Sequence, residues 1–412
     1  MPSSPAEPFD ALLIHGASVF TPTRTARETS VLISNGRIAA IGSPERVSAR
    51  ARLREAREID ASGLIVAPGF IDIQINGAAG QLITTAKTAD AILTVARLLP
   101  RFGCTAFLPT VISAPLDVMR AALHAIGEAR SDPIVGARIL GAHLEGPFLN
   151  PESAGAHPRA YLQPPSAALL RDLWEASRGS LRVLTIAPEL DGARETIEEA
   201  GRLGIVIAIG HSRASIEQAA SAQERGVRLV THLFNASGPV SARKPGIIGA
   251  ALTSDGMNAS LIPDGVHVHP AMMRLALRAL GAKRLVLVTD AMPPIGSSRR
   301  TFDLLGAPIE ARDGACYTRD GRLAGGLLTM DEAVRSVRAM VDVGVADALA
   351  MATRNPARVL GLDRQLGSLR VGAQADLAIL SESLEVRMTI VGGRVIYRAD
   401  QELQRMARSR SC

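Results

Sequence analysis

The sequence predicts an α/β protein in which a (β/α)8 TIM-like barrel carries a small β-sandwich domain built from both chain ends. Two observations predict this fold. Through the middle of the chain, apolar runs of about five to eight residues alternate with stretches of helical periodicity, a pattern typical of βα units and a parallel sheet. At both ends, shorter alternating runs are separated by turn residues. We therefore expect a composite β domain over residues 1–66 and 370–400, and a barrel over residues 67–369.

The N-terminal β segment contains a strong hairpin pattern. Asn35 and Gly36 stand between two alternating apolar runs, and this dipeptide favours the two-residue turn of a β-hairpin. Runs of the same kind return at 375–380 and 388–397, close to the other end of the chain. The two ends are therefore expected to assemble one sandwich.

The middle of the chain contains eight segments that fit buried parallel strands. They lie near 69–75, 105–111, 137–144, 181–187, 205–210, 228–233, 258–263 and 284–289. Segments of helical periodicity lie between them, at 87–99, 115–129, 166–177, 191–202, 213–225 and 270–280. Eight such strands, alternating with helices, predict a closed barrel.

The composition fits an enzyme-sized globular chain. With 412 residues, 47% of them hydrophobic and 21% charged, the chain can bury a large core. The first thirty residues have no basic segment followed by an apolar one, and no run of about 18 apolar residues follows, so we expect a cytoplasmic protein with no membrane partner. Cys104, Cys316 and Cys412 lack a Cys-x-x-Cys spacing, which argues against a disulfide framework and a structural zinc site.

The formal net charge of +6 does not indicate a nucleic-acid partner. The arginines are scattered along the chain and lack interleaved aromatic residues on which bases could stack. A small anionic substrate would still be attracted by such a field. The segment 401–412 is basic and polar without an apolar period, so we expect a disordered tail there.

Several predicted strands end in residues that can bind a metal or move a proton. His143 and Glu145 end the third strand, His211 the fifth, His232 the sixth and Asp290 the eighth. The carboxyl ends of barrel strands carry the active site. One carboxylate and two imidazoles suit a catalytic zinc or a similar divalent ion, which acidifies a bound water. A further carboxylate could then move the proton to a departing amine, which predicts amide hydrolysis.

The motifs around these residues resemble those of a known family. Ala-Pro-Gly-Phe-Ile-Asp (67–72) and Asn-Pro-Ala-Arg-Val-Leu-Gly-Leu (355–362) resemble the barrel entry and exit of the amidohydrolase superfamily. His-Leu-Glu-Gly-Pro (143–147), Thr-His-Leu-Phe-Asn-Ala (231–236) and Pro-Asp-Gly-Val-His (263–267) resemble motifs of the N-acetylglucosamine-6-phosphate deacetylases. The resemblance covers the chain except its extreme ends. It implies release of acetate from N-acetylglucosamine-6-phosphate to give glucosamine-6-phosphate.

The resemblance also implies roles for individual residues. Glu145, His211 and His232 match the metal ligands, and Asp290 matches the catalytic acid and base. Positions that match substrate contacts are Ala156, His157, Asn235, Ala236, Arg243, His267, Leu323, Ala324 and Gly325. Similar deacetylases associate at least as dimers, so a homodimer or larger homo-oligomer is expected, in which Arg243 or His267 reaches a neighbour's site.

One departure from the superfamily bears on the metal count. Many amidohydrolases open the barrel with a His-x-His pair that holds a second metal, whereas Gln74 and Asn76 stand here. Neutral amides are poor zinc ligands beside imidazoles, so we expect one divalent ion, with zinc preferred. Gln74 and Asn76 are expected to hydrogen-bond the ligands or a water. His143 is expected to support the metal ligands from the same strand as Glu145.

Several alternatives remain open at this point. A deacylase of N-acetylgalactosamine-6-phosphate or of an N-acyl-amino acid would use the same barrel and metal. A non-enzymatic scaffold is the least favoured hypothesis, because the acid/base position is intact in Asp290. The native metal, the preferred sugar and the exact oligomer are not decided by the sequence.

Overall fold

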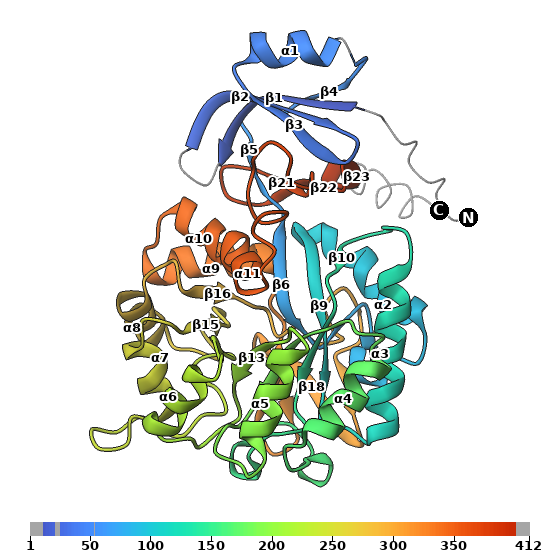
Figure 1. The fold of residues 1–412 in the computed structure, drawn as a ribbon. Helices are drawn as coiled ribbons and strands as arrows, with labels where there is room; N and C mark the ends of the chain where they lie inside the picture. Colours follow the sequence, from blue (N-terminus) through green and yellow to red (C-terminus); the bar gives the residue numbers. More distant parts are fainter. Residues whose placement is uncertain (1–10, 21–24, 53, 401–412) are drawn as a thin grey trace.

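Eight parallel strands form a nearly closed barrel in the middle of the chain (Figure 1). The computed structural model describes residues 11–20, 25–52 and 54–400. Each barrel strand pairs in parallel with the next one in the order of this list: β6 (Phe70–Ile75), β9 (Cys104–Ile112), β11 (Ala142–Glu145), β12 (Leu181–Ile186), β13 (Val206–Ile209), β14 (Leu229–Val230), β15 (Asn258–Leu261) and β16 (Leu285–Leu287). A short strand, β10 (Arg138–Ile139), also pairs with β9. These strands confirm the predicted barrel, each within a few residues of its expected position.

The barrel closes between its first and last strands through few backbone contacts. A single parallel bridge joins Ile75 to Ala291, and the Asp290 N–H donates to the Gln74 carbonyl at 3.1 Å. The buried Asp72 carboxylate supports this seam, because it accepts hydrogen bonds from the Gln74 N–H at 3.1 Å and from the Thr289 hydroxyl. Burial raises the pKa of Asp72 to about 7. The closure of the barrel thus depends on side-chain hydrogen bonds as well as on backbone pairing.

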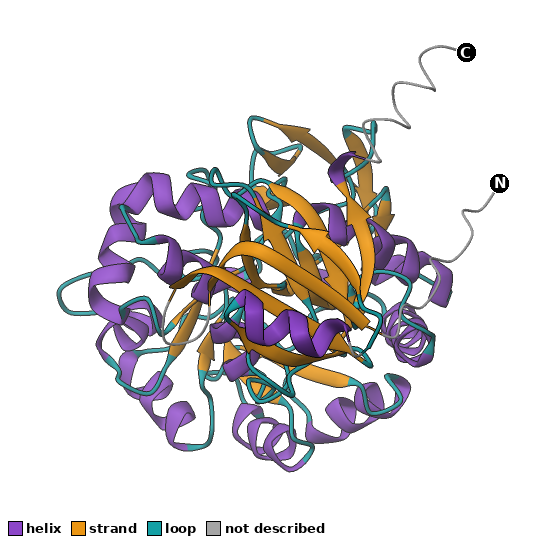
Figure 2. Cartoon of the chain, turned by 90° about the horizontal axis from the view of Figure 1, so that it is seen from above, coloured by secondary structure: helices purple, strands orange, loops and turns teal. Residues whose placement is uncertain are grey.

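Helices surround the barrel on its outer face (Figure 2). Between the strands lie α2 (Ala89–Leu98), α3 (Leu116–Ser131), α4 (Ala167–Ala176), α5 (Ala193–Arg202), α6 (Ile216–Glu224), α7 (Gly246–Thr253) and α8 (Pro270–Leu280). After the eighth strand come α9 (Met330–Val341), α10 (Val345–Ala352) and α11 (Arg354–Val359). Hydroxyl residues begin several of them: Ser215 and Gln218 form a capping box at α6, and Ser166 caps α4. The helices bury one face against the strands in a single large core.

Both chain ends contribute to one eight-stranded sheet above the barrel (Figure 1). Its order is β23 (Arg394–Arg398), β22 (Val386–Val391), β21 (Leu377–Leu380), β5 (Ile65–Pro68), β1 (Ala11–Phe20), β2 (Thr25–Ser34) and β3 (Arg37–Gly42), with β4 (Arg57–Asp60) beside β1. Leu12 and Ile14 of β1 share a core with residues of β21 and β22, while Leu13 packs on the other side against α1 (Pro44–Arg52). Successive side chains of β1 thus enter two different cores, as expected for a strand that is covered on both faces.

The predicted hairpin is confirmed. Asn35 and Gly36 join β2 to β3 with φ values of 51° and 70°, the left-handed values that a type I′ turn requires. The segments 401–412 and 1–10, and therefore the expected tail and Cys412, lie outside the described residues. Cys104 and Cys316 are both buried free thiols. Among the described residues, no helix has the length and apolar character needed to cross a membrane.

An antiparallel sheet follows the eighth barrel strand and was not predicted. It contains β17 (Thr301–Leu304), β18 (Ala307–Arg312), β19 (Ala315–Thr318) and β20 (Leu323–Gly326). Asp-Gly pairs at 313–314 and 320–321, between short alternating runs, are the turn pattern that could have revealed it. Its β20 reaches the barrel mouth, where Gly326 bridges Ala291. A second, two-stranded ribbon of β7 (Gly77–Ala78) and β8 (Gln81–Leu82) lies beside the same mouth, because the Ala79 and Gly80 N–H groups bond residues 293–295.

Candidate metal and catalytic site

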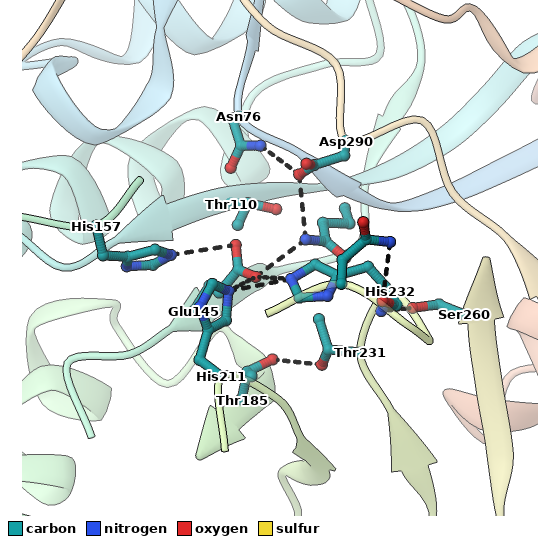
Figure 3. A network of polar contacts seen from close by, with 12 residues as sticks. Asn76, Thr110, Glu145, His157, Thr185, His211, Thr231, His232, Ser260 and Asp290 are labelled. Atoms are coloured by element: carbon teal, nitrogen blue, oxygen red, sulfur yellow. Dashed lines mark hydrogen bonds and ion pairs between the residues drawn. The ribbon is translucent and has the colours of Figure 1, made fainter. Parts of the chain in front are cut away.

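Three predicted metal ligands converge at the carboxyl ends of the barrel strands (Figure 3). Glu145 is the last residue of β11, and His211 and His232 follow β13 and β14. The Nε2 atoms of His211 and His232 lie 3.2 and 2.9 Å from Glu145 Oε1 and 3.1 Å from each other. All three side chains are buried. Two imidazole nitrogens and a carboxylate oxygen facing one point form the donor set of a mixed O/N divalent-cation site.

The hydrogen bond at the other nitrogen sets the tautomer of His211. Its Nδ1 lies 2.9 Å from the Ser153 carbonyl, which can only accept, so Nδ1 carries the proton and Nε2 has a free lone pair. Ser153 belongs to the short 3-10 helix η3 (Pro151–Ser153), which follows the strand of Glu145. His211 is therefore oriented for metal binding before any ion arrives.

The two histidine ligands and the predicted acid/base residue have left-handed backbone, whereas Glu145 ends its strand without a positive φ. The φ values are 49° at His211, 29° at His232 and 50° at Asp290. Side chains other than glycine rarely adopt this conformation, and such strain gathers at functional sites. At each strand end it turns the side chain inward over the barrel instead of continuing the pleat.

Glu145 is suited to remain ionised. Burial alone would raise the pKa of Glu145, but its close contacts with the imidazoles of His211 and His232 outweigh burial and hold the pKa well below its usual range. An ionised carboxylate is the form that binds a cation.

Asp290 lies beside the ligand cluster and is held by two amides. Its Oδ1 accepts from Asn76 Nδ2 at 2.6 Å and from Gln74 Nε2 at 3.1 Å, and the same Gln74 nitrogen donates to Glu145 Oε1 at 3.1 Å. Burial, and then the charge of Glu145, raise the pKa of Asp290 to about 6. The structure thus places Gln74 and Asn76 where the sequence predicted them, as hydrogen-bond donors beside the ligands.

His157 faces the opposite side of the Glu145 carboxylate (Figure 3). The Ser113 N–H donates to His157 Nδ1 at 3.3 Å, so the ring proton belongs on Nε2, which lies 3.9 Å from Glu145 Oε2. Burial lowers the pKa of His157 to about 3, so the imidazole is neutral at physiological pH. It therefore presents a neutral N–H donor to the site.

His143 does not support the metal ligands directly, which corrects its expected role. Its Nδ1 donates to the Ile73 carbonyl at 3.0 Å, and its Nε2 accepts from the Thr185 hydroxyl at 2.8 Å. Thr185 in turn bonds Thr231 at 2.8 Å. Residues two apart in a strand share a face, so His143 and Glu145 of β11 both point into the barrel but lie in different layers. His143 thus links β6, β11 and β12. Both of its nitrogens are used in these bonds, so neither is free to contact the metal ligands.

His267 has a buried partner that the sequence argument missed. Its Nδ1 lies 2.6 Å from Asp264 Oδ2, and Asp264 Oδ1 accepts the N–H groups of Val266 at 2.8 Å and His267 at 2.7 Å. The side chains of Asp264 and His267 are only 5% and 4% exposed. The carboxylate therefore holds the proton on Nδ1 and turns Nε2 of His267 toward the cavity. Asp264 lies within the quoted Pro-Asp-Gly-Val-His motif, and its spacing of three residues from a histidine was the available signal.

Asp264→Asn is expected to raise KM for the substrate by about 10-fold or more, because the amide offers an N–H where His267 needs an acceptor. Steady-state kinetics would measure it. In the double variant with His267→Ala, the additional effect of Asp264→Asn should disappear if Asp264 acts through His267. Independent, additive losses would show instead that Asp264 only stabilises the loop.

A cavity of about 330 Å³ opens over these groups. Its lining includes the ligands, Asp290 and eight of the nine predicted substrate contacts: Ala156, His157, Asn235, Ala236, His267, Leu323, Ala324 and Gly325. Leu323, Ala324 and Gly325 come from β20, so the unpredicted sheet supplies one wall. Asn235 also braces a ligand, because its Nδ2 donates to the His232 carbonyl at 3.2 Å. Arg322, which the sequence argument did not single out, lines the cavity as well.

The ninth predicted contact, Arg243, does not line this cavity in its own chain. The loop at 239–244 is exposed and closes on itself, with reciprocal backbone bonds between Ser241 and Lys244 at 3.1 and 3.2 Å. Arg243 instead lines a separate groove with Arg213 and Lys244. A contact between Arg243 and the site of a neighbouring subunit stays a prediction.

Comparison with known proteins places this geometry in a class. The chain belongs to the amidohydrolase family, whose model matches residues 65–396. This family is metal-dependent, and Glu145, His211 and His232 supply a group able to hold an ion.

Within that class, the relatives are deacetylases of amino-sugar phosphates. N-acetylglucosamine-6-phosphate deacetylase of Bos taurus is 37% identical over 398 residues, covering 93% of this chain and 96% of the relative. N-acetylgalactosamine-6-phosphate deacetylase of Shewanella sp. (strain ANA-3) is 34% identical, covering 95% and 97%. The crystal structure of N-acetylglucosamine-6-phosphate deacetylase from Pasteurella multocida superposes with a TM-score of 0.88 at 30% identity, covering 93% of this chain and 99% of that one.

Proposed function

We propose that this chain hydrolyses the acetamide of N-acetylglucosamine-6-phosphate to glucosamine-6-phosphate and acetate. The observation that carries the proposal is the convergence of a Glu/His/His ligand set and a separate carboxylate, Asp290, on one cavity. The names of full-length relatives supply the substrate. N-acetylgalactosamine-6-phosphate is the second candidate, because relatives with that name are nearly as similar in sequence.

The donor set fits one divalent ion, and we propose zinc. Glu145, His211 and His232 would hold it, and the bound ion would acidify a water and polarise the acetyl carbonyl. Among the described residues, no comparable set of ligands for a second ion lies near Gln74 and Asn76. Gln74 donates to the carboxylates of Glu145 and Asp290, and Asn76 donates to Asp290, so neutral N–H donors face these carboxylates where a second cation would otherwise lie.

The side chains around the ion would divide the remaining work. Asp290, with its pKa raised to about 6, suits a group that first accepts the proton of the attacking water and then donates it to the departing nitrogen. His157 can donate its neutral Nε2–H to the acetyl oxygen as negative charge develops there. His267, held by Asp264, can bond the sugar phosphate from the same cavity.

Turnover of a panel of acetylated compounds would test the proposal. We expect kcat/KM for N-acetylglucosamine-6-phosphate to exceed that for unphosphorylated N-acetylglucosamine by at least about 10²-fold, since a phosphate can make several charge-assisted hydrogen bonds. Acetate release, followed by an enzyme-coupled assay, is the measurement. A preference for the galactosamine epimer would select the second candidate, and turnover of N-acyl-amino acids alone would contradict both. An inert protein with bound metal would indicate a scaffold.

Association and compartment are part of the same proposal. We propose a cytoplasmic homodimer or larger homo-oligomer, in which Arg243 reaches the cavity of a neighbouring subunit. The exposed position of the 239–244 loop supports this arrangement, because Arg243 lies outside its own cavity. His267 lines the cavity of its own chain, which favours a role within the same subunit.

A further inference from the structure

The cavity is poor in positive charge for a site that takes a phosphorylated substrate. It contains the carboxylates of Glu145 and Asp290. Among the described residues that line it, Arg322 is the only arginine or lysine. Arg243, the cation expected from the family resemblance, lines another groove in this chain.

The guanidinium of Arg322 is held in place at the mouth of the cavity. Its Nη1 donates to the Gly155 carbonyl at 2.7 Å, and its Nε donates to Asp320 Oδ2 at 2.8 Å. Gly155 precedes Ala156 and His157, whereas Arg322 precedes β20, so this contact joins two separate segments of the cavity lining. The turn beneath it is fixed by bonds between Thr318 and Arg322, including Arg322 N–H to Thr318 Oγ1 at 3.0 Å.

Two of the five N–H groups of the guanidinium are used in these contacts. The guanidinium makes no other hydrogen bond within the part of the chain that the structure describes, which leaves both N–H groups of Nη2 available. The side chain is 55% exposed, so an incoming anion can reach it. A planar guanidinium with a restricted orientation is suited to phosphate oxygens.

We propose that Arg322 is the cation of this chain that binds the substrate phosphate, and that it therefore sets the preference for phosphorylated sugars. This inference rests on the proposed function. It places phosphate recognition on the β17–β20 sheet of the same subunit, with any contribution of Arg243 coming from a neighbour. Because Arg322 also bonds the Gly155 carbonyl, a phosphate bound to Arg322 would order the segment that carries His157 as well as the segment that carries Arg322.

The test compares Arg322→Gln with Arg319→Gln, a matched control on the same hairpin whose side chain is exposed. For each protein, kcat/KM is measured with N-acetylglucosamine-6-phosphate and with N-acetylglucosamine. We expect Arg322→Gln to lower the ratio of the two values by about 10- to 100-fold, the effect of a lost charge-assisted bond, and Arg322→Lys to restore it in part. Arg319→Gln should keep the wild-type ratio.

Binding of inorganic phosphate, measured by calorimetry on the metal-loaded proteins, gives a readout that does not depend on turnover. Affinity for phosphate should fall in Arg322→Gln and remain in Arg319→Gln. Equal losses on both sugars with unchanged phosphate affinity would overturn the inference and assign Arg322 a purely structural role. A wild-type protein that ignores the phosphorylated sugar would instead refute the proposed function, before any variant is compared.

Discussion

Asp290→Asn is expected to lower kcat by about 10²-fold or more while leaving the fold and the bound metal intact. The amide is nearly isosteric and keeps an oxygen for the N–H groups of Asn76 and Gln74, which now hold Asp290 Oδ1. What it loses is the ability to accept a proton near neutral pH. The raised pKa of Asp290, about 6, is matched to that task, and an asparagine does not titrate there.

Single-turnover and steady-state kinetics would measure the loss, with circular dichroism and elemental analysis as checks on fold and metal. Asp313→Asn is a suitable control, because this exposed hairpin residue has a φ of 48° that asparagine tolerates. If Asp290→Asn turned over at nearly the wild-type rate, another group would move the proton. His157 would then be the candidate, since both nitrogens of His143 are already used in the layer below.

His211→Ala and His232→Ala are each expected to remove the metal and to reduce turnover by about 10³-fold or more. A metal ion contributes several kcal/mol of transition-state stabilisation, and each 1.4 kcal/mol corresponds to a factor of ten. Either substitution leaves two of the three converging ligand atoms. Elemental analysis after dialysis should find about one divalent ion per wild-type chain and far less in both variants.

His124→Ala provides the control for the loss of a histidine, because His124 lies on α3 at the surface beside Glu128. It should keep both metal and activity. Two ions per chain, both needed for turnover, would contradict the one-metal proposal and would require Gln74 or Asn76 to reorient. Retention of the ion in His211→Ala and His232→Ala would contradict the ligand assignment itself.

The parts of this structure that could be predicted are those specified by local pattern. Apolar strands ending in Glu145, His211, His232 and Asp290 indicated both the barrel and the site, because the carboxyl ends of barrel strands must meet. The Asn35-Gly36 turn was predicted for a similar reason, since few residues accept its φ values. In these cases a short stretch of sequence is enough to determine the local structure.

The missed features depend on which side chains meet in space. Nothing near His143 in the sequence shows that Ile73 and Thr185 will occupy its nitrogens. The β17–β20 sheet contains turn pairs but short, half-exposed strands, so its pattern is weak beside that of the barrel. Arg243 and Arg322 are a further example, because the sequence does not show whether an arginine on a loop faces a cavity. Only the fold shows that Arg322 lines the site cavity and that Arg243 lines another groove.

The sheet shared by the two chain ends also affects how the protein is synthesised. Pro68 of β5 pairs with Leu377 of β21, roughly 300 residues later. At ribosomal rates of about 5–20 residues per second, β5 waits roughly 15 to 60 s for its partner. During that time the apolar faces of β1 and β5, including Ile14 and Val66, lack the β21 and β22 side chains that later bury them. A chain truncated near the end of the barrel would therefore keep this strand edge unpaired, and we expect it to aggregate more readily than the full chain.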